Sequence, residues 1–285
     1  RPDDLAEAKR LIQGRAALVA KIEKPQAIHR LAGIIEQADA IMVARGDLGV
    51  ELNPEDVPPL QKKIVNATRL TGKPVIVATQ MLESMIESPA PTRAEVSDVA
   101  NAVYDGADAV MLSAETAAGQ WPEEAVLMMD AIARSVERDE AYRARVRLLD
   151  TPPDPTTADA LAHACMTIAD TVPISAIAVF TCSGASARRV TRERPAVPVM
   201  VLTPSVAVAR RVALLWGAHA VATRDIGSFE EMIGKGKRMA LRHGFGAAGT
   251  KLAVMAGVPF GQPGATNLVH IVTIVGDELE RHAGA

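Results

Sequence analysis

Four short apolar runs in the first half of the chain each end in polar side chains that can do chemistry. At the first of these ends, in "AALVAKIEKPQA", a lysine and a glutamate are separated by the single apolar residue Ile22. Because strand side chains alternate between two faces, the lysine and the glutamate point the same way. A cation beside a carboxylate can hold an anion and a metal ion, although a plain ion pair has the same spacing. The four polar pairs are Lys21 and Glu23, Arg45 and Asp47, Thr79 and Gln80, and Ser113 and Glu115.

Repeated strand–helix units position these pairs, since each apolar run is followed by a segment of helical spacing. The helix in "PTRAEVSDVANAVYDG" is predicted to begin near Pro91 and Thr92 and to end at Gly106. Continuous apolar strands that alternate with helices predict a parallel sheet covered on both faces. The carboxyl ends of parallel strands meet at one edge, where α/β enzymes place their active sites. The sequence therefore predicts one site shared by the four strand ends.

Composition excludes several classes of protein. The 285 residues are 48% hydrophobic, which is enough for a sizeable core, and the net charge of -3 gives no reason to expect nucleic acid or a membrane surface as partner. Cys165 and Cys182 lack metal-type spacing and suit a reducing compartment. No apolar stretch has the length of a membrane span and no signal peptide opens the chain, so the cytoplasm is the expected location.

A charged and then proline-rich segment, residues 144–156, is predicted to link two domains. Residues 1–143 hold the four strand–helix units described above. Residues 157–285 again alternate helices and strands, which predicts a separate layered α/β domain.

Long motifs in the first domain resemble pyruvate kinase. "KIEKPQA", "IMVARGDLGVEL", "VIVATQMLESM" and "PTRAEVSDVANAVYDGADAVMLSAETAAGQWPEEAV" occur in this order, and "TCSGASA" and "GVPFGQPGATN" resemble loops of that family's effector domain. The resemblance implies an α/β fold: strands five to eight of a (β/α)8 TIM-type barrel, followed by a three-layer α/β domain. By the resemblance, the helix before strand five starts at about Arg1, so the first half of the barrel and the lid domain are expected to be missing, with weak or absent turnover by this chain alone.

The resemblance implies transfer of a phosphoryl group from phosphoenolpyruvate to ADP, giving pyruvate and ATP. Catalysis of such a transfer is mainly positioning and electrostatic stabilisation. Lys21 matches the family's transition-state lysine, and Glu23 and Asp47 match its ligands for Mg²⁺, or Mn²⁺. The family's K⁺ site is expected in the missing part.

Three further residues match positions near the substrate. Gly46 and Asp47 match the place where the family binds the substrate carboxylate, at the start of a short helical turn. Thr79 matches a substrate-contacting threonine on the face where the enolate is protonated, and Ser113 is a candidate for a proton relay. Without the motifs, an ordinary tight turn at Gly46 and backbone hydrogen bonding by Thr79 and Ser113 explain these residues equally well.

The loop "TCSGAS" of the second domain lies between a strand and a helix, where hydroxyls and backbone N–H groups can hold a phosphate. It resembles the family's sugar-phosphate effector pocket, with "FGQPGATN" as the facing loop; a simple strand–helix turn is the alternative. The effector residues implied are Thr181, Ser183, Gly184, Ser186 and Gly264.

Three functions remain open at this point. The first is pyruvate kinase, which the family suggests is a tetramer. The second is another Mg²⁺-dependent barrel enzyme, a lyase that handles phosphoenolpyruvate or pyruvate. The third is a non-catalytic module for effector binding and assembly, since a half barrel has open sheet edges that invite pairing with another chain.

Overall fold

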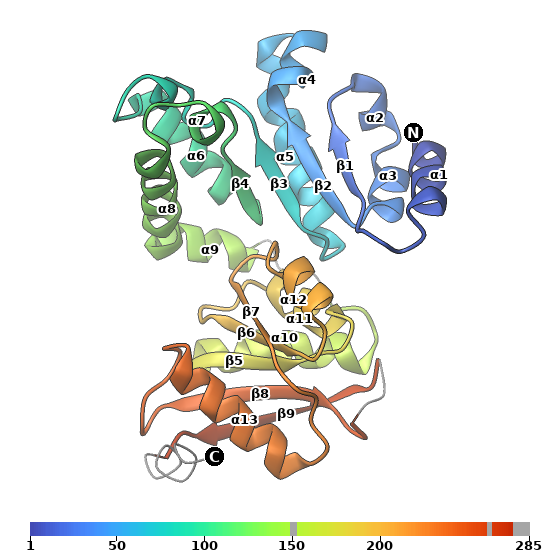
Figure 1. The fold of residues 1–285 in the computed structure, drawn as a ribbon, viewed down its shortest axis with the longest axis vertical. Coiled ribbons are helices and arrows are strands. Elements are labelled where there is room, and N and C mark those ends of the chain that lie inside the picture. The colour runs from blue at the N-terminus through green and yellow to red at the C-terminus, as the bar shows by residue number, and fades with distance from the viewer. Residues whose placement is uncertain (149–152, 261–263, 276–285) are drawn as a thin grey trace. The chain divides into compact units, whose positions relative to one another are not determined.

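The computed structural model describes residues 1–148, 153–260 and 264–275 (Figure 1). The chain divides between Leu149 and Asp150 into two compact units, which are described in turn. No helix among the described residues is long and apolar enough to cross a membrane.

The first unit is built on a four-stranded parallel sheet in the order β1-β2-β3-β4. The strands are β1 (Val19–Ile22), β2 (Ala40–Ala44), β3 (Val75–Ala78) and β4 (Ala109–Met111). Each pairs in register with the next, so their carboxyl ends lie along one edge of the sheet (Figure 1). The α/β fold with a parallel sheet is confirmed, and within the described residues the sheet is open, with β1 and β4 at its edges.

Helices follow each strand. They are α1 (Pro2–Ile12), α2 (Pro25–His29), α3 (Leu31–Gln37), α4 (Arg45–Glu51), η1 (Pro54–Asp56), α5 (Val57–Leu70), η2 (Glu83–Ile86), α6 (Arg93–Tyr104), α7 (Ala114–Ala117), α8 (Pro122–Arg138) and α9 (Glu140–Leu148).

The start of α6 lies where the sequence predicts it. Thr92 Oγ1 accepts the N–H of Glu95, and the Glu95 carboxylate accepts the N–H of Thr92, a reciprocal pair that satisfies two free amides of the helix end. The same carboxylate also accepts the N–H of Ser84, which ties η2 to α6. Gly106, with φ +94°, ends the helix in the left-handed conformation that glycine favours.

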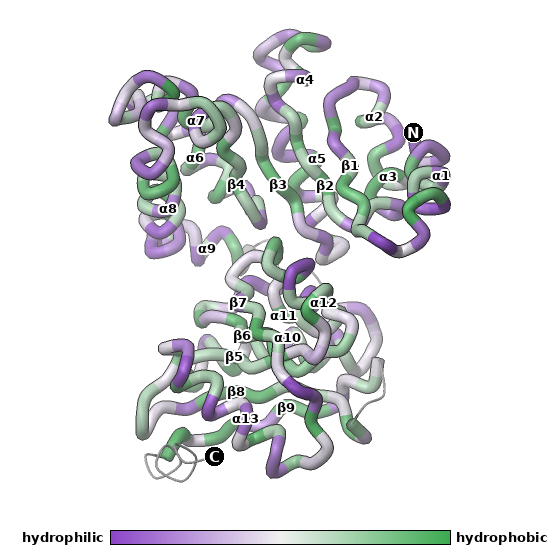
Figure 2. The backbone as a smooth tube through the Cα atoms, in the orientation of Figure 1, coloured by the Kyte–Doolittle hydropathy of each residue, from purple (hydrophilic) through white to green (hydrophobic). Residues whose placement is uncertain are grey.

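One face of this sheet is well covered. Ile22, Val43 and Val77 are fully buried or nearly so and pack into a core with side chains from the helices. Figure 2 shows the four strands as largely hydrophobic among more hydrophilic loops and helix surfaces. On the other face Val19 is 40% exposed and Lys21 is exposed, so the prediction of a sheet covered on both faces is wrong for the β1 side. The alternating exposure of β1 is the pattern of a strand with one covered face.

Part of the predicted linker is helical. Residues 144–148 belong to α9, and Tyr142 and Val146 of this helix pack with Val103 and Val136 in a small core of their own. The high charge of this segment suggested a linker. The segment is nevertheless helical, because the helix buries the apolar side chains of Tyr142 and Val146. Residues 149–152 of the predicted linker lie outside the described residues.

The second unit is a five-stranded sheet in the order β7-β6-β5-β8-β9, in which only the β8–β9 pair is antiparallel. Its described elements are α10 (Thr157–Thr171), β5 (Ile174–Phe180), α11 (Ala185–Arg192), β6 (Val199–Thr203), α12 (Val206–Val212), β7 (Ala218–Ala222), α13 (Phe229–Arg242), β8 (Lys251–Gly257) and β9 (Thr266–Thr273). Alternate strand residues pack against α10, α11 and α12 on one face and against α13 on the other. This is the three-layer arrangement expected from the sequence.

The two cysteines differ in reactivity. Cys165 of α10 is fully buried, and burial raises the pKa of its thiol to about 12, whereas Cys182 is exposed. Because the thiolate is the reactive form, a thiol reagent at pH 8 is expected to modify Cys182 alone in the folded chain and both cysteines in denaturant. Mass spectrometry of the labelled chain measures this, and modification of Cys165 without denaturant would contradict the packing of α10.

Candidate active site

The lysine and two carboxylates predicted at the strand ends meet in the structure. Lys21 lies in β1, Glu23 follows it, and Asp47 lies in the first turn of α4, just after β2. Lys21 Nζ lies 2.9 Å from Glu23 Oε2 and 2.9 Å from Asp47 Oδ2. These side chains are between 39% and 50% exposed, so a ligand in solution can reach them.

Lys21 offsets one of the two negative charges of this cluster. The hydrogen bond to the Asp47 carboxylate, and then that to Glu23, raises the pKa of Lys21 above its ordinary value of 10.5, so the amine is charged at neutral pH. Exposed ion pairs contribute only about 0–1 kcal/mol to stability, which makes stability a weak reason for placing three charges here.

The donor set of Glu23 and Asp47 fits a hard divalent cation. Carboxylate oxygens are the ligands that Mg²⁺ prefers, and Mg²⁺ commonly takes one or two of them together with waters and substrate oxygens. The two carboxylates already converge on one cation, the ammonium of Lys21. No group of three or more His, Cys, Asp and Glu side chains suited to a metal occurs in the part of the chain that was described.

Thr79 and Gly46 lie in contact. Thr79 Oγ1 accepts the N–H of Gly46 at 2.8 Å and donates to the carbonyl of Ala78 at 2.6 Å. A Cβ at Gly46 would lie 3.4 Å from Thr79 Oγ1, an ordinary van der Waals distance, so this contact alone does not require glycine. The N–H of Gly46, expected to face a substrate carboxylate, is therefore engaged by Thr79 in this structure.

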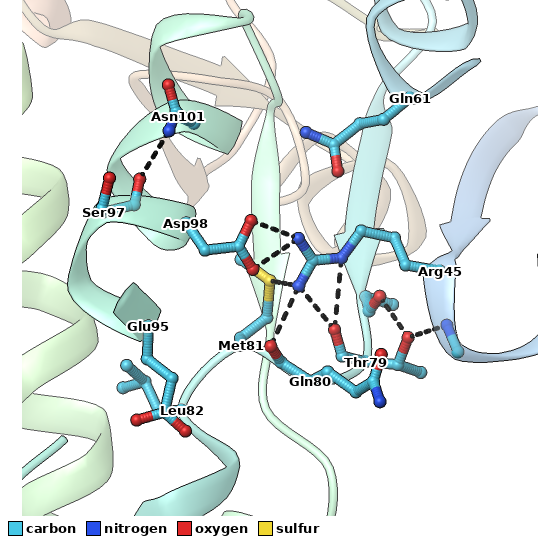
Figure 3. A network of polar contacts seen from close by, with 12 residues as sticks. Arg45, Gln61, Thr79, Gln80, Met81, Leu82, Glu95, Ser97, Asp98 and Asn101 are labelled. Atoms are coloured by element: carbon cyan, nitrogen blue, oxygen red, sulfur yellow. Dashed lines mark hydrogen bonds and ion pairs between the residues drawn. The ribbon is translucent and has the colours of Figure 1, made fainter. Parts of the chain in front are cut away.

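The backbone at the end of β3 is unusual. Thr79 has φ +70° and Gln80 has φ +54°, two successive left-handed residues that are not glycine. Such conformations are uncommon, and for a β-branched residue such as threonine they are outliers. Figure 3 shows the Arg45 guanidinium reaching the carbonyls of both residues and the carboxylate of Asp98.

Asp98 is a site residue that the sequence pattern does not indicate. It lies on α6, where a charged side chain is ordinarily on the solvent face. Its carboxylate is 2.6 Å from Arg45 Nη1, and Arg45 is only 8% exposed.

Ser113 and Glu115 connect the last two strand ends. The buried Glu115 carboxylate accepts the N–H of Ser113 at 2.7 Å and that of Leu82 at 3.3 Å, which holds the loop after β4 against the loop after β3. Ser113 is the N-cap of α7 without a side-chain capping bond. Ser113 therefore lies at the predicted edge of the sheet, and the geometry gives no evidence for its predicted role in a proton relay.

Four of the five predicted effector residues line one cavity in the second unit: Thr181, Ser183, Ser186 and Gly264. Gly184 is not among the lining residues; with φ +84° it forms the N-cap of α11, and a Cβ there would lie 2.8 Å from Val212 Cγ1. Arg189, Arg224 and Asp225 also line the cavity, and Arg189 is paired with the buried Asp159; the loop motif alone does not indicate these charged groups.

Comparisons with known proteins agree with this architecture. The barrel-domain model of pyruvate kinase matches residues 1–126, and its alpha/beta-domain model matches residues 159–272. The chain belongs to the pyruvate kinase family. The two pyruvate kinase matches fall in the two structural units, one in each.

Curated pyruvate kinases from three bacteria resemble the chain over nearly all of its length. The protein of Methylorubrum extorquens is 50% identical over 281 residues, 99% of this chain and 59% of the relative. One from Agrobacterium vitis is 45% identical over 98% of this chain and 58% of the relative, and that of Geobacillus stearothermophilus is 41% identical over 100% and 49%. The chain thus spans between about half and three fifths of the length of these relatives.

Proposed function

We propose that this chain carries pyruvate kinase chemistry, in which a phosphoryl group passes from phosphoenolpyruvate to ADP and gives pyruvate and ATP. The observation that supports this most is the position of Lys21 Nζ, 2.9 Å from carboxylate oxygens of both Glu23 and Asp47 at the end of β1. Membership of the pyruvate kinase family supplies the reaction class.

In this proposal Glu23 and Asp47 hold Mg²⁺, or Mn²⁺ in its place. When bound, such an ion neutralises negative charge on phosphoryl oxygens. The ammonium of Lys21 then faces the transferring phosphoryl group and the enolate oxygen, where a fixed positive charge stabilises the charge that develops. We also propose that the reaction uses K⁺, and no residue of this chain is assigned to bind it.

Thr79, Gly46 and Ser113 complete the proposed substrate site. The Thr79 hydroxyl contacts the substrate near the enolate carbon; to donate a proton there it has to release the carbonyl of Ala78, to which it now donates. Gly46 and Asp47 lie beside the substrate carboxylate, and the N–H of Gly46 donates to Thr79 Oγ1. Ser113 is a proposed member of a proton relay.

A coupled assay for pyruvate tests the proposal, with phosphoenolpyruvate, ADP, Mg²⁺ and K⁺. The assay compares two proteins, this chain alone and a hybrid. In the hybrid, this chain is joined to the part of the Methylorubrum extorquens pyruvate kinase that it does not match. We expect pyruvate formation that requires ADP and Glu23, and a slower rate in the chain alone, because positioning accounts for most of the catalysis. An unchanged rate in Glu23→Gln would contradict the proposal, and pyruvate formation without ADP would favour the lyase.

A sugar-phosphate effector is proposed for the cavity of the second unit, supported by its hydroxyls and by Arg189 and Arg224. Cys182 lines the same cavity, so a bound hexose phosphate is expected to slow its labelling by a thiol reagent. Cys165 is the internal control. Unchanged labelling of Cys182 at saturating hexose mono- and bisphosphate would contradict effector binding here.

We also propose that the chain assembles into a homo-oligomer, a tetramer by analogy with the family. The neighbouring exposed apolar side chains Val126 and Leu127 of α8 are available for burial against another copy. Multi-angle light scattering measures the state, and a monomer at high concentration would contradict this part of the proposal.

A further inference from the structure

We propose that Arg45 is a positioning residue: with Asp98, it holds the Thr79–Gln80 turn in a left-handed conformation and so places the Thr79 hydroxyl at the site. The proposal that this turn exists because of Arg45 stands on geometry alone. Its consequence for catalysis rests on the proposed function.

The turn needs an external restraint. Thr79 and Gln80 have φ +70° and +54°, and a left-handed conformation is energetically unfavourable for residues other than glycine. Two in succession, one of them β-branched, do not persist unless neighbouring groups hold them. Both carbonyls of these residues point toward Arg45, as Figure 3 shows.

Arg45 supplies the restraint through several donors. Its Nη2 donates to the Thr79 carbonyl at 2.7 Å and to the Gln80 carbonyl at 3.1 Å, and its Nε adds a longer bond of 3.3 Å to Thr79. The planar guanidinium spreads these donors in a fixed fork, which a lysine ammonium cannot reproduce. A hydrogen bond from a charged donor inside the protein is among the stronger ones.

Asp98 fixes the orientation of that fork. The Asp98 carboxylate accepts a hydrogen bond from Arg45 Nη1 at 2.6 Å, on the side of the guanidinium away from the turn. The guanidinium therefore lies between Asp98 of α6 and the Thr79–Gln80 turn. With only 8% of Arg45 exposed, the carboxylate also supplies the charge partner that a buried cation requires.

Gly46, the residue after Arg45, also contacts Thr79 through its backbone. The N–H of Gly46 donates to Thr79 Oγ1, while the Arg45 side chain holds the Thr79 carbonyl. Two successive residues at the start of α4 thus hold the threonine at two points. Asp47, which contacts Lys21, follows them directly, so the same turn of α4 fixes Thr79 and a proposed metal ligand relative to each other.

The test measures the turn itself, without substrate or metal. Crystal structures and amide hydrogen exchange by NMR compare the wild-type chain with Arg45→Lys and Asp98→Asn, and with Arg134→Lys, an exposed partner of Asp130, as control. In Arg45→Lys we expect Thr79 and Gln80 to leave the left-handed region and the Gly46 amide to exchange about tenfold faster or more, because it loses Thr79 Oγ1. Asp98→Asn is expected to change exchange in the same direction by less.

Unchanged backbone angles and unchanged Gly46 exchange in Arg45→Lys would overturn the proposal. If Arg45→Lys does not fold, Asp98→Asn provides the test: slower or equal amide exchange at Gly46 in that variant would overturn the proposal.

A chemical rescue separates positioning from general loss of structure. In Arg45→Gly, methylguanidinium at concentrations that do not denature is expected to restore the slow exchange of Gly46, entering by the cavity beside Arg45, Gly46 and Asp98, whereas methylammonium is not. Because no readout involves turnover, an inactive hybrid would count against the proposed function and leave this result standing.

Discussion

Replacing Lys21 by Met is expected to slow pyruvate formation in the hybrid about 10²–10³-fold, the usual cost of removing one preorganised stabilising group. The ammonium is the cation that lies between Glu23 and Asp47, where phosphoryl and enolate oxygens are proposed to bind. Mn²⁺ affinity is expected to be retained, because both carboxylates remain. Stopped-flow or quenched-flow measurement of a single turnover isolates the phosphoryl-transfer step.

Lys24→Met is the matched control for this experiment. Lys24 lies three residues further on and pairs with Glu51 at 2.7 Å, outside the proposed site. Its loss is expected to change the rate less than about threefold, because exposed ion pairs contribute little. Normal turnover in Lys21→Met would remove Lys21 from the mechanism.

Replacing Asp159 by Ala is expected to destabilise the second unit by about 1–3 kcal/mol, since it removes the partner of Arg189 and leaves the buried Arg192 with Glu193 as its remaining carboxylate partner. Asp159 is 2% exposed, and its carboxylate lies 2.8 Å from Arg189 and 3.2 Å from Arg192. Urea unfolding, followed by the fluorescence of Trp216, measures the change in the free energy of unfolding. The experiment uses a Trp121→Phe background, in which Trp216 is the one tryptophan. Glu230→Ala, an exposed carboxylate of α13, is the control and is expected to cost less than about 1 kcal/mol.

The pH dependence of this effect has a definite sign. Although burial opposes ionisation, the N–H of Asp154 and the guanidinium of Arg192 hold the pKa of Asp159 below its ordinary value of 3.8. A lowered folded-state pKa contributes stability above the unfolded-state value, and this contribution is lost as pH falls through the folded-state pKa. The difference between wild type and Asp159→Ala is therefore expected to be constant near neutrality and to shrink below about pH 4. A difference that grows toward acid pH would contradict the assignment.

The parts of the site that depend on periodicity were predictable. Strand alternation puts Lys21 and Glu23 on one side, and parallel strands bring the end of β2, with Asp47, to the same edge; the structure brings all three together. The reciprocal cap of α6 at Thr92 follows from residue types three positions apart. These features are local or follow from the period of the chain.

Other features depend on contacts between distant residues. The left-handed Thr79 has no local signal, since threonine avoids positive φ and the contacts that hold it come from Arg45 and Gly46, more than thirty residues earlier in the chain. Asp98 resembles any polar residue of a surface helix until the fold brings its carboxylate to Arg45. The exposed face of β1 depends on which partners cover a sheet, and a strand pattern alone does not define them.

The most direct test of the central claim is a Mn²⁺ titration of this chain, followed by electron paramagnetic resonance, for the wild type, Glu23→Gln, Asp47→Asn and the control Glu51→Gln. If the two carboxylates at the ends of β1 and β2 form the divalent-metal site, each of the first two variants weakens binding about tenfold or more, because each removes one charged oxygen ligand. Glu51→Gln leaves it unchanged. Equal affinity in the wild type and in Glu23→Gln or Asp47→Asn would contradict the account.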